Sequence, residues 1–142
     1  MIPNFSIAGR TAALVAAMTL APLLSGCQTG SPSRALNLKS TGEPVDIIVS
    51  IGRTAHACWF VSKDPGFGGF RLADEAHSPA GRPRLLLVPR RDPGGLPKLV
   101  IQAEKVDGVT DIQVYGPALS TNLGSRITGD VERWVSGNSN CR

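Results

Sequence analysis

The sequence predicts a small α+β domain, in which an antiparallel sheet of three or four strands carries two helices on one face and is tied by a disulfide. Three observations carry this prediction: short extended stretches separated by turn residues, an apolar stripe at helical spacing near the C-terminal end, and a pair of cysteines suited to a disulfide. The domain is expected over residues 43–142, enough chain to bury one core.

The first element lies within "EPVDIIVSIGRTAHACWF", residues 43–60, and its pattern fits two structures. Val45, Ile48, Ala55 and Trp59 recur at helical spacing, and Asp46 suits the positive end of a helix. The β-branched run "IIVSI" instead favours a strand over part of residues 45–58. The length of the stretch and its alanine-rich second half favour the helix. The following "VSKDPGFGGF" is expected to form a loop.

Four extended stretches follow, and they predict the sheet. They are "GFRLADEA" (69–76), "RPRLLLVPR" (82–90), "PKLVIQAEK" (97–105) and "TDIQVYG" (110–116). The segments between them, "HSPAG", "RDPGGLP" and "VDGV", have the Gly, Pro and Asp content of tight turns. Such spacing predicts an antiparallel meander of three or four strands, with one face of the sheet left uncovered by helices.

A second helix is predicted in "ALSTNLGSRITGDVERWVSGN", residues 118–138. Its apolar stripe comprises Leu119, Leu123, Ile127, Val131 and Trp134 or Val135. Ser120 or Thr121 is expected to cap its start, and Gly137 with Asn138 to end it. The remaining face, with Asn122, Arg126, Asp130 and Arg133, is predicted to meet solvent.

The N-terminal segment predicts export. Arg10 precedes the apolar run "TAALVAAMTLAPLLSG", which is shorter than the roughly 20 residues that a membrane-spanning helix needs. Leu24-Ser25-Gly26-Cys27 resembles the lipobox of bacterial lipoproteins. The resemblance implies that residues 1–26 are a signal peptide, cleaved before a diacylglycerol-modified Cys27. The alternative is an ordinary secretory signal.

The residue after the cysteine also matters in that family. Gln28, in place of an aspartate, resembles the sorting pattern that sends lipoproteins to the outer membrane of a two-membrane bacterium. Residues 27–42, rich in Ser, Gly and Thr, are then expected to hold the lipid and act as a flexible tether.

With Cys27 carrying lipid, Cys58 and Cys141 remain, and in an oxidising periplasm they predict a disulfide. Closing so long a loop is worth on the order of 4 kcal/mol in chain-entropy estimates. Four up-and-down strands would make the two helices antiparallel, with Cys58 far from the end of the second. Residues 59–67 crossing the domain, or a sheet of three strands, would bring the cysteines together.

No stretch predicts a cofactor or metal site. The chain has two histidines, no zinc-ligand spacing, and no phosphate-binding loop in "DPGFGGF". A formal net charge of +4 is too small to argue for a nucleic-acid partner. The sequence therefore predicts a non-enzymatic binding or scaffolding module of the cell envelope. The alternative is a small periplasmic hydrolase or thiol-dependent enzyme that uses Cys58 beside His56.

One charged feature offers a contact site. Arg82 and Arg84 precede the apolar run Leu85–Val88, and Arg90 and Arg91 follow it. These arginines act either as solvated charges that keep a sticky strand from aggregating, or as contacts for an anionic envelope polymer such as lipid A or peptidoglycan. An envelope protein is the other expected partner. Four aromatic residues, Trp59, Phe60, Phe67 and Phe70, are expected either to pack against Trp134 or to form an exposed patch.

Overall fold

The computed structural model describes residues 34–79 and 81–142. The predicted signal peptide, Cys27 and the first part of the predicted tether lie outside the described residues. The elements in chain order are β1 (Leu36–Ser40), α1 (Pro44–Ala55), β2 (Phe70–Glu75), β3 (Arg84–Pro89), β4 (Leu99–Val106), β5 (Val109–Tyr115) and α2 (Gly124–Val135). Short helical turns lie at His56–Val61, Pro65–Phe67 and Pro117–Ser120. Within the described ranges, no helix is both long and apolar enough to cross a membrane.

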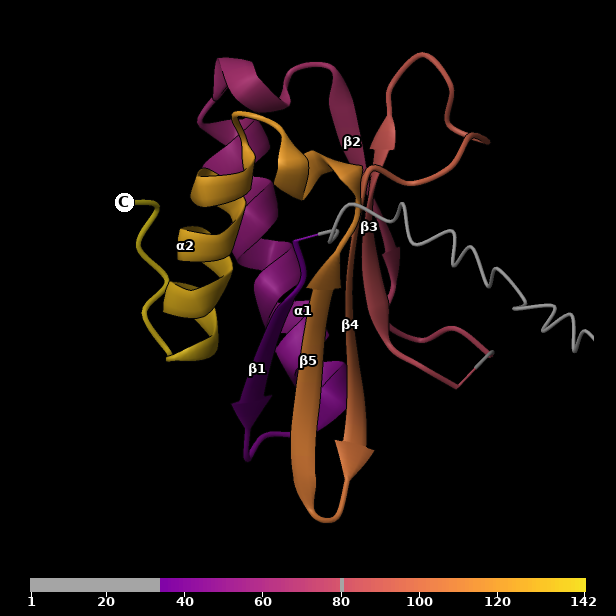
Figure 1. Ribbon diagram of the computed structural model, residues 1–142, viewed down its shortest axis with the longest axis vertical. Helices are drawn as coiled ribbons and strands as arrows, with labels where there is room; N and C mark the ends of the chain where they lie inside the picture. Colours follow the sequence, from indigo (N-terminus) through magenta and orange to yellow (C-terminus); the bar gives the residue numbers. More distant parts are fainter. Residues whose placement is uncertain (1–33, 80) are drawn as a thin grey trace, which may run out of the picture.

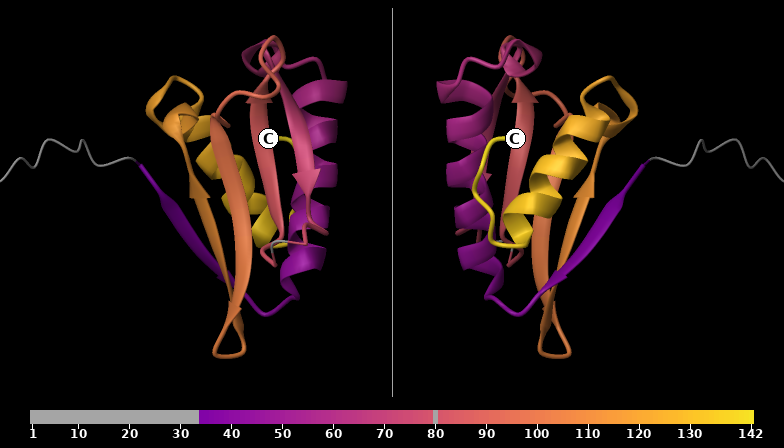
Figure 2. Two further views of the ribbon diagram at one scale, coloured as in Figure 1. Left: turned by 90° about the vertical axis from the view of Figure 1, so that its right-hand side faces the viewer. Right: turned by 90° about the vertical axis from the view of Figure 1, so that its left-hand side faces the viewer.

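The five strands form one antiparallel sheet in the order β1-β5-β4-β3-β2 (Figure 1). Both helices lie on one face of it, and no helix of the described chain covers the other face (Figure 2). The α+β class, the antiparallel sheet and the two helices on one face are thus confirmed. The prediction of three or four strands was wrong, because the sheet has five.

The extra strand is β1, which lies in the segment predicted to be tether. Its residues alternate between half-buried and exposed positions, as a strand with one covered face requires. Leu36 pairs with Val114 and Leu38 with Ile112, so β1 extends the core along the edge of β5. The tether prediction therefore fails from residue 36 onward, and β1 belongs to the domain.

The helical interpretation of residues 45–58 was correct. Pro44 occupies the first turn of α1, where its missing N–H costs nothing, and Asp46 follows it. The β-branched residues are tolerated because the inner stripe of α1, Ile48, Ile51, Gly52 and Ala55, is buried against the sheet. The helix continues as a π-helical turn, His56–Val61, which directs Cys58 and Trp59 into the core.

The second helix begins later than predicted, at Gly124. Thr121 does not cap it but closes the preceding turn: its hydroxyl donates to the carbonyl of Ala118 (2.7 Å) and accepts from the N–H of Leu123 (3.2 Å). The helix ends as expected at Gly137, whose φ of 91° lies in the left-handed region. Ile127, Val131 and Trp134 form its buried stripe.

The cysteines meet by neither predicted route. The two helices do run antiparallel, and the chain after Gly137 turns back along α2 toward the end of α1 (Figures 1 and 2). The N–H of Asn138 donates to the carbonyl of Arg133 (3.0 Å), and the Arg133 guanidinium donates to the carbonyls of Asn140 and Cys141. This tail, residues 138–142, carries Cys141 to Cys58.

The aromatic residues belong mainly to the core, as the packing alternative predicted. Trp59 stacks on Phe67 with ring centroids 4.4 Å apart and lies 5.2 Å from Trp134. Trp59 and Phe67 are buried, whereas Phe60 and Phe70 are half-buried at the margin of the same cluster. No exposed aromatic patch forms from these four residues.

Candidate binding surface

Cys58 and Cys141 form the predicted disulfide, with Cα atoms 5.1 Å apart. The bond joins the π-helical turn after α1 to the tail. Because the sulfur of Cys58 is bonded, it offers no thiolate in this structure, and nucleophilic thiol chemistry requires the thiolate. The thiol-dependent alternative thus lacks its nucleophile in the oxidised protein.

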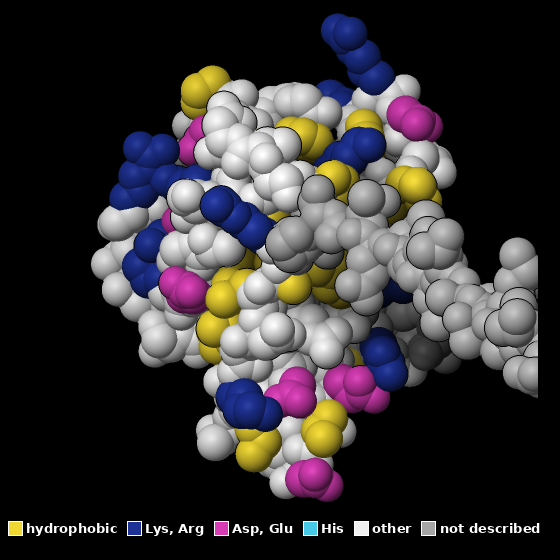
Figure 3. Space-filling view, viewed as in Figure 1, with side chains coloured by type: hydrophobic (Ala, Val, Ile, Leu, Met, Phe, Trp, Pro, Cys, Tyr) yellow, Lys and Arg dark blue, Asp and Glu magenta, His cyan; other side chains and the backbone are white. Residues whose placement is uncertain are grey.

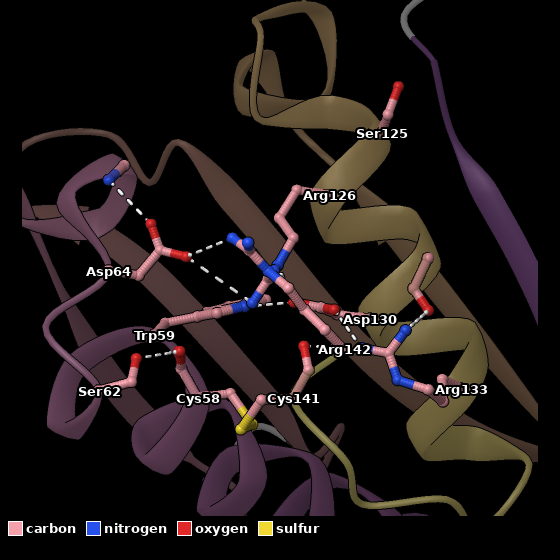
Figure 4. A network of polar contacts seen from close by, with 12 residues as sticks. Cys58, Trp59, Ser62, Asp64, Ser125, Arg126, Asp130, Arg133, Cys141 and Arg142 are labelled. Atoms are coloured by element: carbon pink, nitrogen blue, oxygen red, sulfur yellow. Dashed lines mark hydrogen bonds and ion pairs between the residues drawn. A yellow bond between two sulfur atoms is a disulfide. The ribbon is translucent and has the colours of Figure 1, made fainter.

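Beside the disulfide lies a polar network centred on Asp130 (Figure 4). The Asp130 side chain is 2% exposed, so the prediction that it meets solvent was wrong. Its carboxylate accepts hydrogen bonds from Trp59 Nε1 (2.8 Å), from Arg126 Nε (2.6 Å) and from Arg133 Nη2. Arg126 and Arg133 are also largely covered rather than solvated. Only Asn122 of that predicted face is exposed.

The network has a structural explanation. The tail folds over the α2 face that carries Arg133, and Trp59 meets that face from the π-helical turn after α1, so two segments cover what would otherwise be a solvated side. Arg126 and the terminal Arg142 reach Asp64 in the loop after α1 at 3.7 and 3.4 Å. Each charge meets an opposite charge, and the cluster joins the two helices rather than presenting a reactive group.

A groove of about 380 Å³ runs between α1 and the edge strand β2. Its lining residues are Val49, Gly52, Arg53, His56, Leu72, Asp74 and Leu85. A histidine and an aspartate thus share one groove, but none of these lining side chains is a hydroxyl or thiol that a histidine base could activate. Within the described ranges, no cluster of His, Cys, Asp and Glu is arranged to hold a metal ion.

The four arginines of the predicted contact site separate into two pairs at opposite ends of β3. Arg82 pairs with Glu104 (3.2 Å) and Arg84 with Glu75 (2.5 Å), so both are neutralised by neighbouring carboxylates. Arg90 and Arg91 lie at the other end, are exposed, and form no ion pair within the described ranges. The structure therefore divides the arginines into one pair that carboxylates neutralise and one pair without a carboxylate partner.

The sheet brings two further cations to Arg90. Arg71 of β2 pairs with Val88 of β3. On the β4 side of β3, Leu87 pairs with Leu99, so Lys98, the residue before β4, lies opposite Val88. Two strand spacings, about 10 Å, separate Arg71 from Lys98. The N–H of Arg90 donates to the carbonyl of Gly69 (2.9 Å), which holds Arg90 beside the start of β2. We call Arg71, Arg90, Arg91 and Lys98 the basic cluster.

Sequence reasoning missed Arg71 and Lys98 because they are distant in sequence from Arg90. The signal that could have found them is the strand register: in an antiparallel meander, the start of one strand lies beside the end of the next. Neither residue forms an ion pair within the described ranges, and both are exposed. The cluster is therefore a site of uncompensated positive charge.

The two ends of the sheet differ in charge. Two more exposed cations, Arg34 before β1 and Lys63 after α1, lie at the cluster end and form no ion pair in the described chain. One acid, Asp92, lies in the loop between β3 and β4. At the opposite end, around the β4–β5 hairpin, acidic side chains gather (Figure 3). The cations there are paired, Lys39 with Asp111 and Lys105 with Glu43, each at 2.6 Å.

An exposed leucine accompanies the basic cluster. Leu96, in the loop between β3 and β4, is 84% exposed, the highest value among the large exposed hydrophobic residues of the described chain. The loop begins at Arg90 and Arg91 and ends at Lys98, so apolar and basic side chains project from one short segment. Such a segment can contact a partner that is both anionic and apolar.

No protein-family model, no curated protein and no solved structure matches this chain.

Proposed function

We propose that this chain is an outer-membrane lipoprotein, anchored through Cys27, whose domain is a non-enzymatic binding or scaffolding module of the cell envelope. The anchor and its location rest on the sequence pattern "LLSGCQ" and the apolar run before it. The single observation that best supports a non-enzymatic role is the bonding of Cys58 to Cys141, since Cys58 was the candidate nucleophile. In this proposal the molecule that the domain binds carries phosphate or carboxylate groups, which arginine binds as a planar fork.

The contact surface in this proposal is the basic cluster. Arg90 and Arg91, proposed from sequence, have no carboxylate partner, and Arg90 Nη2 donates to the carbonyl of Phe70 (3.4 Å). Arg71 and Lys98 enlarge the site. Arg82 and Arg84 are left out of it because Glu104 and Glu75 already neutralise them.

Mass spectrometry of the protein purified from membranes tests the anchor. We expect a mature chain that begins at Cys27 and carries the mass of attached lipid, and we expect Cys27→Ser to accumulate as an unprocessed or soluble form. A mature terminus elsewhere, without lipid, would show that the lipoprotein assignment is wrong. Thiol titration of the denatured, unreduced protein tests the enzymatic alternative, because a free Cys58 would restore it.

Cosedimentation with isolated envelope fractions tests the contact surface. Replacing Arg90 and Arg91 with Gln should weaken binding, most strongly at low salt, where charges are least screened. The matched control replaces Arg82 and Arg84 with Gln and should bind as the wild type does. Equal binding by both double variants, with intact circular dichroism, would leave these arginines only a role in solubility.

A further inference from the structure

We infer that the end of the sheet carrying the basic cluster docks directly on the surface of an anionic phospholipid bilayer, with Leu96 entering the interface. This inference rests on the proposed function in one respect, that Cys27 is lipidated. Three features of the described chain support it: the distribution of unpaired charge, the exposed Leu96, and the place where the chain enters the domain.

The first feature is charge complementarity. Arg71, Arg90, Arg91 and Lys98 are exposed, and no carboxylate of the described chain pairs with them. Basic residues close to an anionic leaflet each contribute about a fivefold change in the partition of a protein to the membrane. At the far end of the sheet, around the β4–β5 hairpin, the cations are paired with carboxylates, so that end offers no comparable attraction to the same surface.

The second feature is Leu96. Basic residues alone would suit a phosphate-bearing polymer in water as well as a membrane. A leucine that is 84% exposed between Arg91 and Lys98 gains nothing from a hydrated polymer, but it gains burial when it enters the headgroup and acyl boundary of a bilayer. The combination of flanking cations with an apolar tip therefore favours a lipid surface over peptidoglycan.

The third feature is the position of β1. Leu36, the first residue of β1, pairs with Val114 near the end of β5, and the end of β5 pairs with the start of β4. β1 therefore begins at the end of the sheet that holds Lys98 and the Arg90–Pro97 loop (Figure 1). Residues 28–35 separate a lipid on Cys27 from β1, and they can span at most about 30 Å. The chain that leads from the anchor therefore enters the domain at the end of the sheet that carries the cluster.

Site-directed fluorescence tests this orientation in the full chain, expressed, processed and reconstituted into vesicles. Leu96→Cys is labelled with a polarity-sensitive dye, and Val106→Cys, an exposed apolar residue of the opposite hairpin, is the matched control. In vesicles of phosphatidylethanolamine and phosphatidylglycerol, we expect a blue shift at position 96 and none at position 106. Phosphatidylcholine vesicles or high salt should abolish the shift.

Charge variants identify the residues responsible. Replacing Arg90, Arg91 and Lys98 with Gln should lower the docking equilibrium constant by on the order of a hundredfold, the product of three fivefold changes. The control replaces Lys39, Arg82 and Lys105 at the opposite end and should leave the shift at position 96 unchanged. The proposal is overturned if position 96 does not respond to phosphatidylglycerol, if position 106 responds equally, or if only soluble peptidoglycan fragments produce the shift.

Labelling of the wild-type chain distinguishes failure of the docking inference from failure of the proposal that Cys27 is lipidated. A lipidated Cys27 and a bonded Cys58–Cys141 pair leave no thiol for the dye. If the wild type takes up label at residue 27, the anchor is absent, and flotation of that unlipidated chain then tests the surface alone. It should float with phosphatidylglycerol vesicles and lose flotation in the triple Gln variant; equal flotation of the two chains would overturn the inference.

Discussion

Asp130 lies where α1, α2 and the tail meet. It is a buried carboxylate with three donors around it, Trp59, Arg126 and Arg133, and the sequence places it on what looks like the solvated side of a helix. Periodicity identifies the apolar stripe of a helix correctly, but it cannot show that a tail will return to cover another side. The error at Asp130 therefore has a physical cause, the path of residues 138–142.

Replacing Asp130 with Ala should destabilise the fold strongly. The change leaves Arg126 and Arg133 without their shared carboxylate and the Trp59 N–H without an acceptor, and breaking a buried ion pair from one side costs about 3–5 kcal/mol. Chemical denaturation of the oxidised protein measures the loss. Glu132→Ala, an exposed acid of the same helix, is the control and should change stability by less than about 0.5 kcal/mol. Similar losses in both variants would argue against a special role for Asp130.

At the scale of elements, the strength of the local pattern decides what the sequence can predict. The strands β2 to β5 and both helices have clear periodicity bounded by turn residues, and all six occur close to the expected positions. β1 was missed because Leu36 and Leu38 are the only large apolar residues in a segment rich in Ser, Gly and Thr. Its formation depends on the free edge of β5, which is a tertiary contact that no local window contains.

The start of α2 illustrates a requirement that only the structure shows. Gly124 lies so close to the preceding turn that an added Cβ would be 2.1 Å from the carbonyl oxygen of Leu119. Gly129, one and a half turns further along the same helix, has no atom within 4 Å of such a Cβ. The two glycines look alike in the sequence, yet one is required by packing and the other is not.

This contrast gives a paired prediction. Gly129→Ala should stabilise the protein by about 0.5–1 kcal/mol, because alanine is the better helix former. Gly124→Ala should instead destabilise it by about 1–3 kcal/mol, because the backbone of Leu119 must move. Thermal unfolding of the two variants beside the wild type measures both signs. A stabilised Gly124→Ala variant would mean that the turn before α2 is free to shift.

At the scale of the whole molecule, the disulfide and the unequal ends of the sheet dominate. The basic end holds the candidate contact surface, and the sequence could locate Arg90 and Arg91 there but could not say that Arg82 and Arg84 are neutralised. That distinction depends on Glu104 and Glu75, which the sheet register brings beside them. The disulfide was predictable because two cysteines in a small domain that is expected to be exported have few other uses.

Loss of the disulfide should lower global stability without changing the fold. Cys58→Ser with Cys141→Ser removes a link across a separation of 83 residues, for which we expect a loss of about 2–4 kcal/mol. Calorimetry under oxidising conditions should show a lower Tm for the double variant, and reductant should bring the wild type down to that value. A wild-type Tm in the double variant would contradict the structural role assigned to the bond.

The returning tail also determines how the helical layer opens in native-state fluctuations. α2 has no side-chain N-cap and contains two glycines, so taken alone it would fray early. The bonds from Arg133 and Trp134 to the carbonyl of Asn140 hold it to the tail, and the tail is covalently joined to the turn after α1. In the oxidised protein the two helices therefore form one cooperative unit, and their backbone amides should exchange with deuterium at similar rates. Reduction should uncouple them, so that α2 exchanges first while α1 keeps its protection.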